Sequence, residues 1–184
     1  MQKVKGSVLR SRLTFVEESF GEAKLRQVME SLSTEDQQAL TMMLPSSWLP
    51  FDVGKRLDDA IVKVVGGGKP KFFERLGVAS AEKNLTTVHS AFLTPGDPHG
   101  FLAKAPQIYR LYYQTGRREY EKVGEHEAVL TTYEAETFSN PDCLTVIGWY
   151  KRALEYCGAK NPKVVEEECR AKGGAVCRYR VTWE

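Results

Sequence analysis

The chain has 184 residues, of which 42% are hydrophobic and 27% are charged, and this composition is ordinary for a globular protein. Its 26 Lys and Arg residues against 24 Asp and Glu residues leave a net charge of +2, which is too small to indicate nucleic acid as the main partner. No apolar run approaches the roughly 18 residues of a membrane-spanning helix, and the N-terminal segment lacks the apolar centre of a signal peptide. We therefore expect one domain over residues 1–184, in the cytoplasm, with neither nucleic acid nor membrane as a partner.

Helical periodicity dominates the first part of the chain. The clearest helix start is a capping box, in which Ser33 caps the helix and Asp36 follows three residues later. Pro45 then ends that helix, because proline cannot continue it. The expected helices span residues 19–32, 33–44, 51–65 and 101–116, with one or two further helices over residues 71–93.

The period changes after residue 116. Residues 117–136 carry β-favouring side chains on either side of Gly124, which predicts a hairpin. A further helix is expected over residues 140–158, with Asn140 or Asp142 as its cap, and a last hairpin over residues 164–183. The chain is therefore predicted to be an α+β domain, with N-terminal helices packed on a small antiparallel sheet.

The four cysteines are the first candidates for a site. If the last hairpin turns at Gly173, Cys169 and Cys177 lie opposite each other with Cβ atoms roughly 5 Å apart, which suits a shared metal ion. Cys143 and Cys157 lie on one predicted helix, about 21 Å apart, so only one of them can join that pair. Spacing alone does not choose between them. Reduced cytoplasmic thiols favour a metal site, or buried free cysteines, over a disulfide.

Other catalytic or cofactor patterns are weak. His89 lies on an apolar helix face, His99 follows a proline, and His126 lies beside a hairpin turn, so none forms a recognisable haem ligand motif. The sequence has no Ser-His-Asp grouping, no HExxH motif and no nucleotide-binding fingerprint. We therefore do not expect an enzyme.

Several motifs together resemble a known family. They are "KGSVLRSRLTFVEESFG" near the start, "RLYYQTG" in the middle, and then Cys143 with "IGWY", "EEEC" and "AKGGAVCRYRVTW". This pattern resembles the 4-vinyl reductase (V4R) domain family and its myxobacterial-type relatives, which are similar to haem nitric-oxide-binding sensors and TRAPP trafficking subunits. The resemblance implies a bacterial sensory domain with a pocket between helices and sheet. The expected wall residues are Phe92, Tyr109, Tyr112 and Trp149.

The resemblance also implies a structural zinc ion. In one branch, the sensory domains of aromatic-catabolism activators, the ligands follow the order Cys, Glu-x-x-Cys and a Cys eight residues later. The residues here that match this order are Cys143, Glu166, Cys169 and Cys177. In a regular strand Glu166 would face away from Cys169, so a bulge or a turn is required there, or Glu167 would replace Glu166. The Tyr-x-Ser-x-Arg signature of the haem sensors is absent, and haem is therefore not expected.

Two functions follow as expectations. The first is a sensory domain that binds a small hydrophobic or aromatic ligand and works as a homodimer or with a protein partner. The alternative is a TRAPP-like dimeric scaffold without a ligand pocket. A cavity too small for a ligand and an apolar helical surface around Met42 and Met43 would favour the scaffold.

Overall fold

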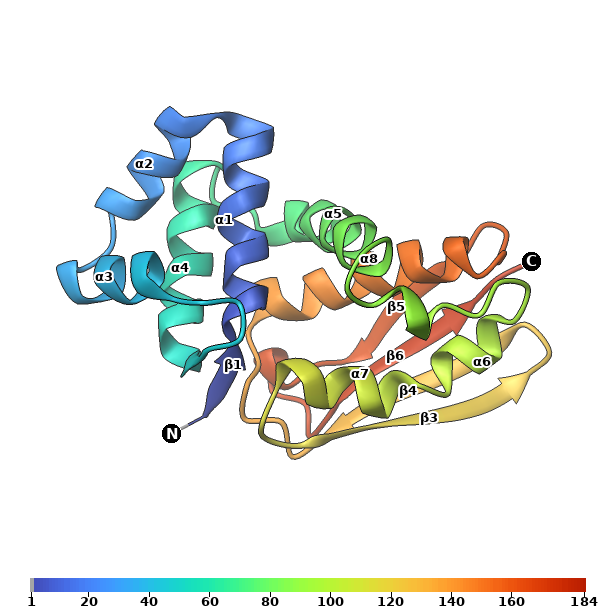
Figure 1. Cartoon of the computed structure of the whole chain (residues 1–184). Coiled ribbons are helices and arrows are strands. Elements are labelled where there is room, and N and C mark those ends of the chain that lie inside the picture. The colour runs from blue at the N-terminus through green and yellow to red at the C-terminus, as the bar shows by residue number, and fades with distance from the viewer. Residues whose placement is uncertain (1) are drawn as a thin grey trace.

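The computed structural model describes residues 2–184 (Figure 1). Across these residues the α-helices are α1 (Gly6–Phe20), α2 (Glu22–Glu30), α3 (Thr34–Met42), α4 (Phe51–Val64), α5 (Phe73–Leu85), α6 (Pro98–Leu102), α7 (Ala105–Tyr112) and α8 (Asn140–Tyr156). The strands are β1 (Lys3–Lys5), β2 (Trp48–Pro50), β3 (Arg117–Gly124), β4 (Glu127–Tyr133), β5 (Lys163–Glu168) and β6 (Cys177–Thr182), and 3₁₀ turns span Pro70–Phe72, Ser90–Phe92 and Arg170–Lys172.

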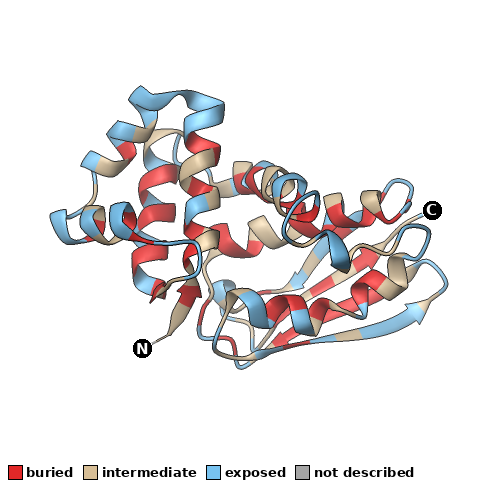
Figure 2. Cartoon of the chain, in the orientation of Figure 1, coloured by how far each residue is buried: buried red, intermediate tan, exposed pale blue. Residues whose placement is uncertain are grey.

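Two groups of elements make up the fold. Helices α1 to α4 stand together at one end with the short β1–β2 pair, and the other group is an antiparallel sheet with strand order β3-β4-β6-β5 (Figure 1). Helix α8 contacts β5, α7 contacts β3, and α5 packs along α8. Buried side chains accordingly form one core within the helical group and another between the sheet and its helices (Figure 2). The predicted α+β class is confirmed.

Helices α5 and α8 touch at two glycines. A Cβ atom at Gly148 would lie 1.8 Å from the carbonyl oxygen of Glu74, and one at Gly77 would lie 2.1 Å from that of Thr145. Only glycine therefore lets the two backbones approach this closely. This explains the glycine of the "IGWY" motif.

Several predicted boundaries are confirmed and others are wrong. The Ser33 hydroxyl caps α3 by accepting from the backbone N–H of Asp36, as expected. The helix expected over residues 19–32 is instead two helices, because Gly21 takes a φ of +84° between α1 and α2. Helix α8 is capped by Ser139, whose hydroxyl accepts from the N–H of Asp142, and not by Asn140 or Asp142 itself.

The two hairpins form where they were expected. In the first, Gly124 pairs with Glu127 at the turn. In the last, the loop contains a 3₁₀ turn and Gly173 in the left-handed region, with a φ of +90°. Burial alternates along β6, with Cys177 and Tyr179 buried and Arg178 between them half-buried. Among residues 2–184, no helix is both long enough and apolar enough to cross a bilayer.

Candidate metal centre and cavity

Three cysteine sulfur atoms meet where α8 begins and the last hairpin turns. The Sγ atom of Cys143 lies 3.9 Å from that of Cys177 and 3.6 Å from that of Cys169. All three sulfur atoms lie within 4.8 Å of one another, and all three residues are buried. In a tetrahedral zinc site, Zn–S bonds of about 2.3 Å place the sulfur atoms about 3.8 Å apart. The two distances from Cys143 are close to this spacing, so the three cysteines could hold a metal ion.

Glu166 lies beside this group because strand β5 is irregular. The register of the β5–β6 pair shifts between Glu166 and Glu168, which is the bulge that the odd sequence spacing required. The Glu166 side chain is only 6% exposed, and its Oε2 atom accepts from the ammonium group of Lys172 at 2.5 Å. Its Oε1 atom is buried and has no hydrogen-bond partner among residues 2–184. Buried acceptors are rarely left without a partner, so this oxygen atom is suited to a ligand.

The Glu166 carboxylate is not part of the cysteine group in this structure. Within residues 2–184, no carboxylate oxygen lies within 4.8 Å of all three. Glu167, the alternative ligand, is exposed and pairs with Arg180. Glu166 is therefore the residue that the fold brings to the cysteine group.

Hydrogen bonding makes the three thiols unequal. The pKa of Cys177 falls to about 7, because Cys143 hydrogen-bonds to its sulfur atom and the backbone N–H of Arg170 donates to it at 3.5 Å, while burial acts in the opposite direction. The pKa of Cys143 is raised by its hydrogen bonds with Cys169 and Cys177 and by burial. Cys177 therefore ionises more readily than Cys143, and the thiolate is the form that binds metal.

Cys157 lies elsewhere. It is buried at the C-terminal end of α8, where its Sγ atom contacts the hydroxyl of Thr94 at 3.9 Å. The fold therefore brings Cys143, not Cys157, to the hairpin cysteines, which is the choice that the family resemblance made.

A cavity of about 60 Å³ lies between α5, α7, α8 and strand β3. Three of the four expected pocket residues line it, namely Tyr109, Tyr112 and Trp149. Phe92 does not line it, and packs partly buried against the core beside His89. The hydroxyl of Tyr112 is buried without a hydrogen-bond partner among residues 2–184, and burial raises its pKa.

Arg118 forms part of the cavity wall and is 7% exposed. Its Nε atom donates to the Thr132 hydroxyl at 2.9 Å, and one Nη atom donates to the Tyr150 hydroxyl at 3.4 Å. No carboxylate among residues 2–184 forms an ion pair with it, whereas its exposed neighbour Arg117 pairs with Glu119. Arg118 was not among the predicted site residues. Strand alternation is the available signal, since Arg118 shares a face with the half-buried Tyr120.

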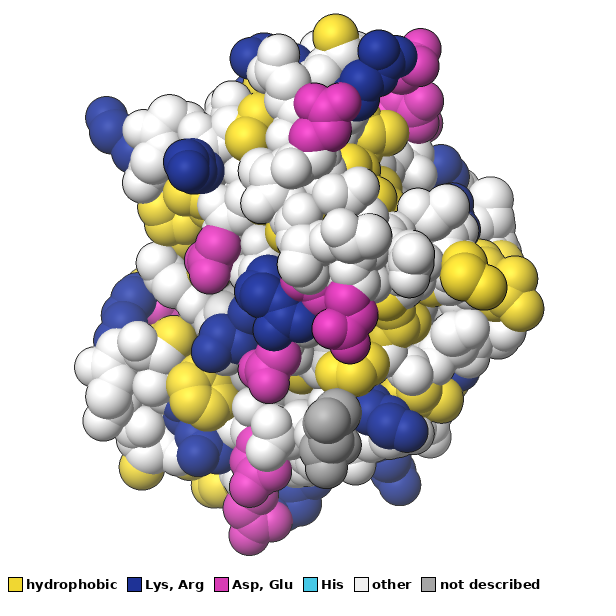
Figure 3. Space-filling model, turned by 90° about the vertical axis from the view of Figure 1, so that its left-hand side faces the viewer, with side chains coloured by type: hydrophobic (Ala, Val, Ile, Leu, Met, Phe, Trp, Pro, Cys, Tyr) yellow, Lys and Arg dark blue, Asp and Glu magenta, His cyan; other side chains and the backbone are white. Residues whose placement is uncertain are grey.

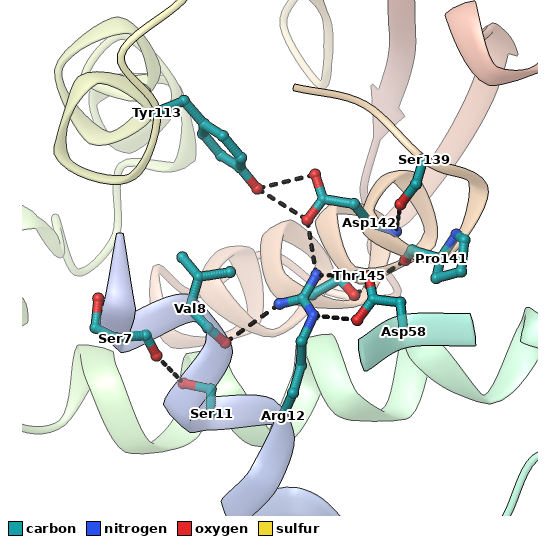
Figure 4. Close-up of polar contacts among 10 residues, drawn as sticks. All are labelled: Ser7, Val8, Ser11, Arg12, Asp58, Tyr113, Ser139, Pro141, Asp142 and Thr145. Carbon is teal, nitrogen blue, oxygen red and sulfur yellow. Dashed lines mark hydrogen bonds and ion pairs between the residues drawn. The ribbon is translucent and has the colours of Figure 1, made fainter. Parts of the chain in front are cut away.

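A buried charged network borders the cavity, because Arg12, Tyr113 and Asp142 also line it (Figure 4). Arg12 of α1 donates to Asp58 of α4 at 2.5 Å and to Asp142 of α8 at 2.8 Å, and the Tyr113 hydroxyl donates to both oxygen atoms of Asp142. Burial raises the pKa of Asp58 to about 6, although the charge of Arg12 opposes the shift. The network ties the helical group to α8.

This network was also absent from the sequence-based predictions. The sequence feature that could have indicated it is a charged residue, Arg12, at a position of α1 where helical periodicity predicts an apolar one. Arg12 lies three residues after Leu9 and four before Val16, and both of these are buried.

None of the three histidines lines the cavity. The His89 ring packs edge-on against Tyr112, and His99 hydrogen-bonds to the Tyr120 hydroxyl at 2.8 Å. The segment Tyr113-Gln-Thr-Gly-Arg117 differs from the Tyr-x-Ser-x-Arg signature by Thr in place of Ser. Its Arg117 is half-exposed and pairs with glutamates.

Comparison with known proteins gives a family and a fold. The family model described as "Protein of unknown function (DUF2378)" matches residues 73–184. No curated protein matches the sequence. Solved structures match over nearly the whole chain, and they are H-NOX proteins.

The Fe(II) unliganded H-NOX protein from K. algicida has a TM-score of 0.76 and 11% identity, covering 98% of this chain and 96% of its own. A Cs H-NOX variant carrying 4-cyano-phenylalanine has a TM-score of 0.71 and 13% identity, covering 98% of this chain and 96% of its own. A structure concerned with haem redox potential and porphyrin distortion has a TM-score of 0.69 and 12% identity, covering 97% of this chain and 99% of its own.

At such low identity these likenesses show the fold alone, which is the fold of H-NOX proteins. Neither the family model nor these structures bear the name of the 4-vinyl reductase family, so that resemblance stays a prediction. The family match covers 61% of the chain, including all three clustered cysteines, Glu166 and Arg118. The chain therefore belongs to the DUF2378 family.

Proposed function

We propose that the chain is a small-molecule-binding regulatory domain in which a structural zinc ion joins helix α8 to the β5–β6 hairpin. The observation that carries the proposal is that the cavity and the cysteine group share a wall. Tyr109, Arg118 and Asp142 line the cavity, and the same residues line a smaller hollow of about 20 Å³ bounded by Cys143 and Cys177. A ligand in the cavity would therefore contact residues that also border the cysteine group.

The fold supports this reading. The matched H-NOX structures are described in terms of iron, haem distortion and activation, so in those proteins this fold serves a bound cofactor. Three expectations belong to the proposal: the chain is cytoplasmic, it is not an enzyme, and it acts as a homodimer or with a protein partner.

Haem does not fit the residues around the cavity. An apolar cavity of about 150 Å³ binds a ligand as small as benzene, and this one is about 60 Å³. A porphyrin would require Tyr109 and Trp149 to leave their places, and no histidine lines the space to bind the iron. By volume, an aromatic ligand therefore fits this cavity only if the wall residues move, whereas a ligand of a few heavy atoms fits without such movement.

Zinc fits the donor set. Cys143, Cys169 and Cys177 would supply three thiolates, and Glu166 would supply the fourth ligand after leaving Lys172. Four protein ligands give a closed shell, which is typical of structural zinc and leaves no position for a substrate. When bound, the ion would supply a cross-link between α8 and the hairpin.

A cavity-filling substitution tests the function directly. Ser80 lines the cavity, and Ser80→Phe should block binding of small molecules detected by a change in Trp149 fluorescence or in melting temperature. Thr87→Phe, at an exposed position just beyond α5, is the matched control and should bind normally. If a broad panel of small neutral and charged compounds leaves the wild-type protein unchanged, the cavity is not a ligand site.

The dimeric scaffold is the second candidate, because some large apolar side chains of the helical group are exposed. Met42 is 80% exposed and Leu44 is 63% exposed, while Met43, expected to share this surface, is buried. On the side of the molecule shown in Figure 3, hydrophobic side chains lie in separate patches among charged ones. Sedimentation of the wild type and of the double variant Met42→Lys, Leu44→Lys would test the scaffold. The scaffold requires that the wild type forms a dimer and that the double variant does not.

A further inference from the structure

We propose that the cavity binds a small carboxylate, and that the guanidinium group of Arg118 holds it. This inference rests on the proposed function, because it names the ligand class of the same cavity. The buried charge of Arg118 is the basis of this inference. Arg118 is buried and remains charged, since arginine does not lose its proton in proteins. Burying a charge without a counter-ion is costly.

The surroundings compensate this charge only in part. Arg118 lies over the rings of Tyr109, Tyr150 and Tyr179, with its central carbon 5.1, 5.5 and 5.9 Å from the ring centroids. Cation–π contacts of this kind reduce the cost but do not supply a negative charge.

The nearest candidate counter-ion on the cavity wall is already engaged. Asp142 lines the cavity, but its oxygen atoms accept hydrogen bonds from Arg12 and Tyr113. Since Asp58 also shares Arg12, that network holds two carboxylates for one arginine. Neither of these carboxylates pairs with Arg118, so the Arg118 guanidinium has no ion-pair partner among residues 2–184.

Size and remaining donors define the ligand. A guanidinium group binds carboxylates and phosphates through two parallel hydrogen bonds, and the small volume of the cavity favours the smaller carboxylate. The Tyr112 hydroxyl on the same cavity is a second donor without a partner among residues 2–184. Ile108, Val146 and Trp149 supply apolar wall for a short carbon chain. A volume of about 60 Å³ restricts the ligand to the size of acetate or propionate.

The test uses the full chain with its metal content determined, in a Trp48→Phe, Trp183→Phe background, so that Trp149 is the only tryptophan. Sodium acetate and sodium propionate are titrated at constant ionic strength set with sodium chloride, and acetamide is the neutral probe. We expect a saturable fluorescence change with the carboxylates and none with acetamide. Arg118→Met should weaken carboxylate binding at least tenfold, while the matched Arg117→Met variant should stay within twofold of the wild type.

Each other result overturns the inference. If acetamide or other neutral compounds bind and carboxylates do not, the ligand class is wrong while the proposed function stands. If nothing in the panel binds, both fail together. If Arg118→Met loses metal but binds carboxylate as the wild type does, Arg118 is only the counter-charge of the thiolates. Should Arg118→Met fail to fold, Arg118→Lys and Tyr112→Phe replace it, and carboxylate binding unchanged in both would overturn the assignment.

Discussion

Asp142 and Cys143 are consecutive residues whose side chains belong to different buried sites. The Asp142 carboxylate accepts from Arg12 at 2.8 Å, and the Cys143 sulfur atom lies 3.6 Å from that of Cys169. The first turn of α8 therefore fixes the helical group through Asp142 (Figure 4) and the last hairpin through Cys143. A shift of this turn would displace side chains at both sites.

The buried ion pair should matter far more than an exposed one. Asp58→Ala leaves Arg12 paired with Asp142 but leaves its buried Nε atom without an acceptor, and we expect a loss of about 2–3 kcal/mol in the free energy of unfolding. Arg56→Ala breaks the pair with Asp36 at a half-exposed arginine, and should cost about 1 kcal/mol or less. Urea unfolding of both variants checks this. Equal losses would mean that burial does not strengthen the Arg12 pair.

Asp58 should also make stability depend on pH. Burial raises its folded-state pKa from 3.8 to about 6, so the folded chain holds a proton there that the unfolded chain releases. This contribution to stability is fully present below about pH 4 and is lost as the pH rises through about 6. Relative to Asp58→Asn, the wild type should lose on the order of 1–3 kcal/mol between about pH 4 and pH 7.

Urea unfolding across that pH range measures the difference. The contradicting result is that the wild type does not lose unfolding free energy relative to Asp58→Asn, or gains it, as the pH rises. Asp58 would then already be ionised in the folded chain at the acidic end of the range.

Gly148→Ala should disrupt the contact between α5 and α8. The added Cβ atom would lie 1.8 Å from the Glu74 carbonyl oxygen, which cannot move without its helix, and we expect a loss of about 3 kcal/mol. At Gly124 a Cβ atom would meet only the Glu127 Cβ at 3.6 Å, so Gly124→Ala is the matched control. Thermal unfolding compares the two. A Gly148→Ala variant as stable as the control would show that the two helices do not touch at this glycine.

Glu166 and Glu167 offer a neighbouring pair for testing the fourth ligand. Glu166→Gln should weaken zinc binding by at least roughly 10- to 100-fold, because that is the range for losing a residue that only supports a metal ligand. Glu167→Gln removes an exposed partner of Arg180 and should leave zinc affinity unchanged. Competition with a chelating dye gives both affinities. The reverse order would place Glu167 in the site, and equal affinities would leave a three-cysteine shell completed by water.

Local signals predicted much of the fold. The capping box at Ser33, the turn at Gly124 and the alternation along β6 depend on neighbours in sequence, and all three are confirmed. The break at Gly21 was missed because the apolar spacing continues across it, although the backbone there has a positive φ. The pairing of β1 with β2 was missed because three-residue strands have no period to detect.

The candidate site depended on contacts between distant segments. The four residues of the proposed zinc shell could be named only through a family pattern, because spacing left Cys143 and Cys157 equivalent. Arg12 and Arg118 look like ordinary surface arginines in the sequence. Their burial follows from what packs against them: Asp142 lies 130 residues away from Arg12, and Arg118 is covered by tyrosines from three elements.

The metal content of the chain purified under reducing conditions tests the central claim most directly. We expect about one equivalent of zinc per chain, retained in Cys157→Ser and lost in Cys143→Ser, with a lower melting temperature after chelation because the metal stabilises the folded state. A wild-type protein that has four reactive thiols, contains no metal, takes up none when zinc is added, and melts at the same temperature with or without chelator would contradict it.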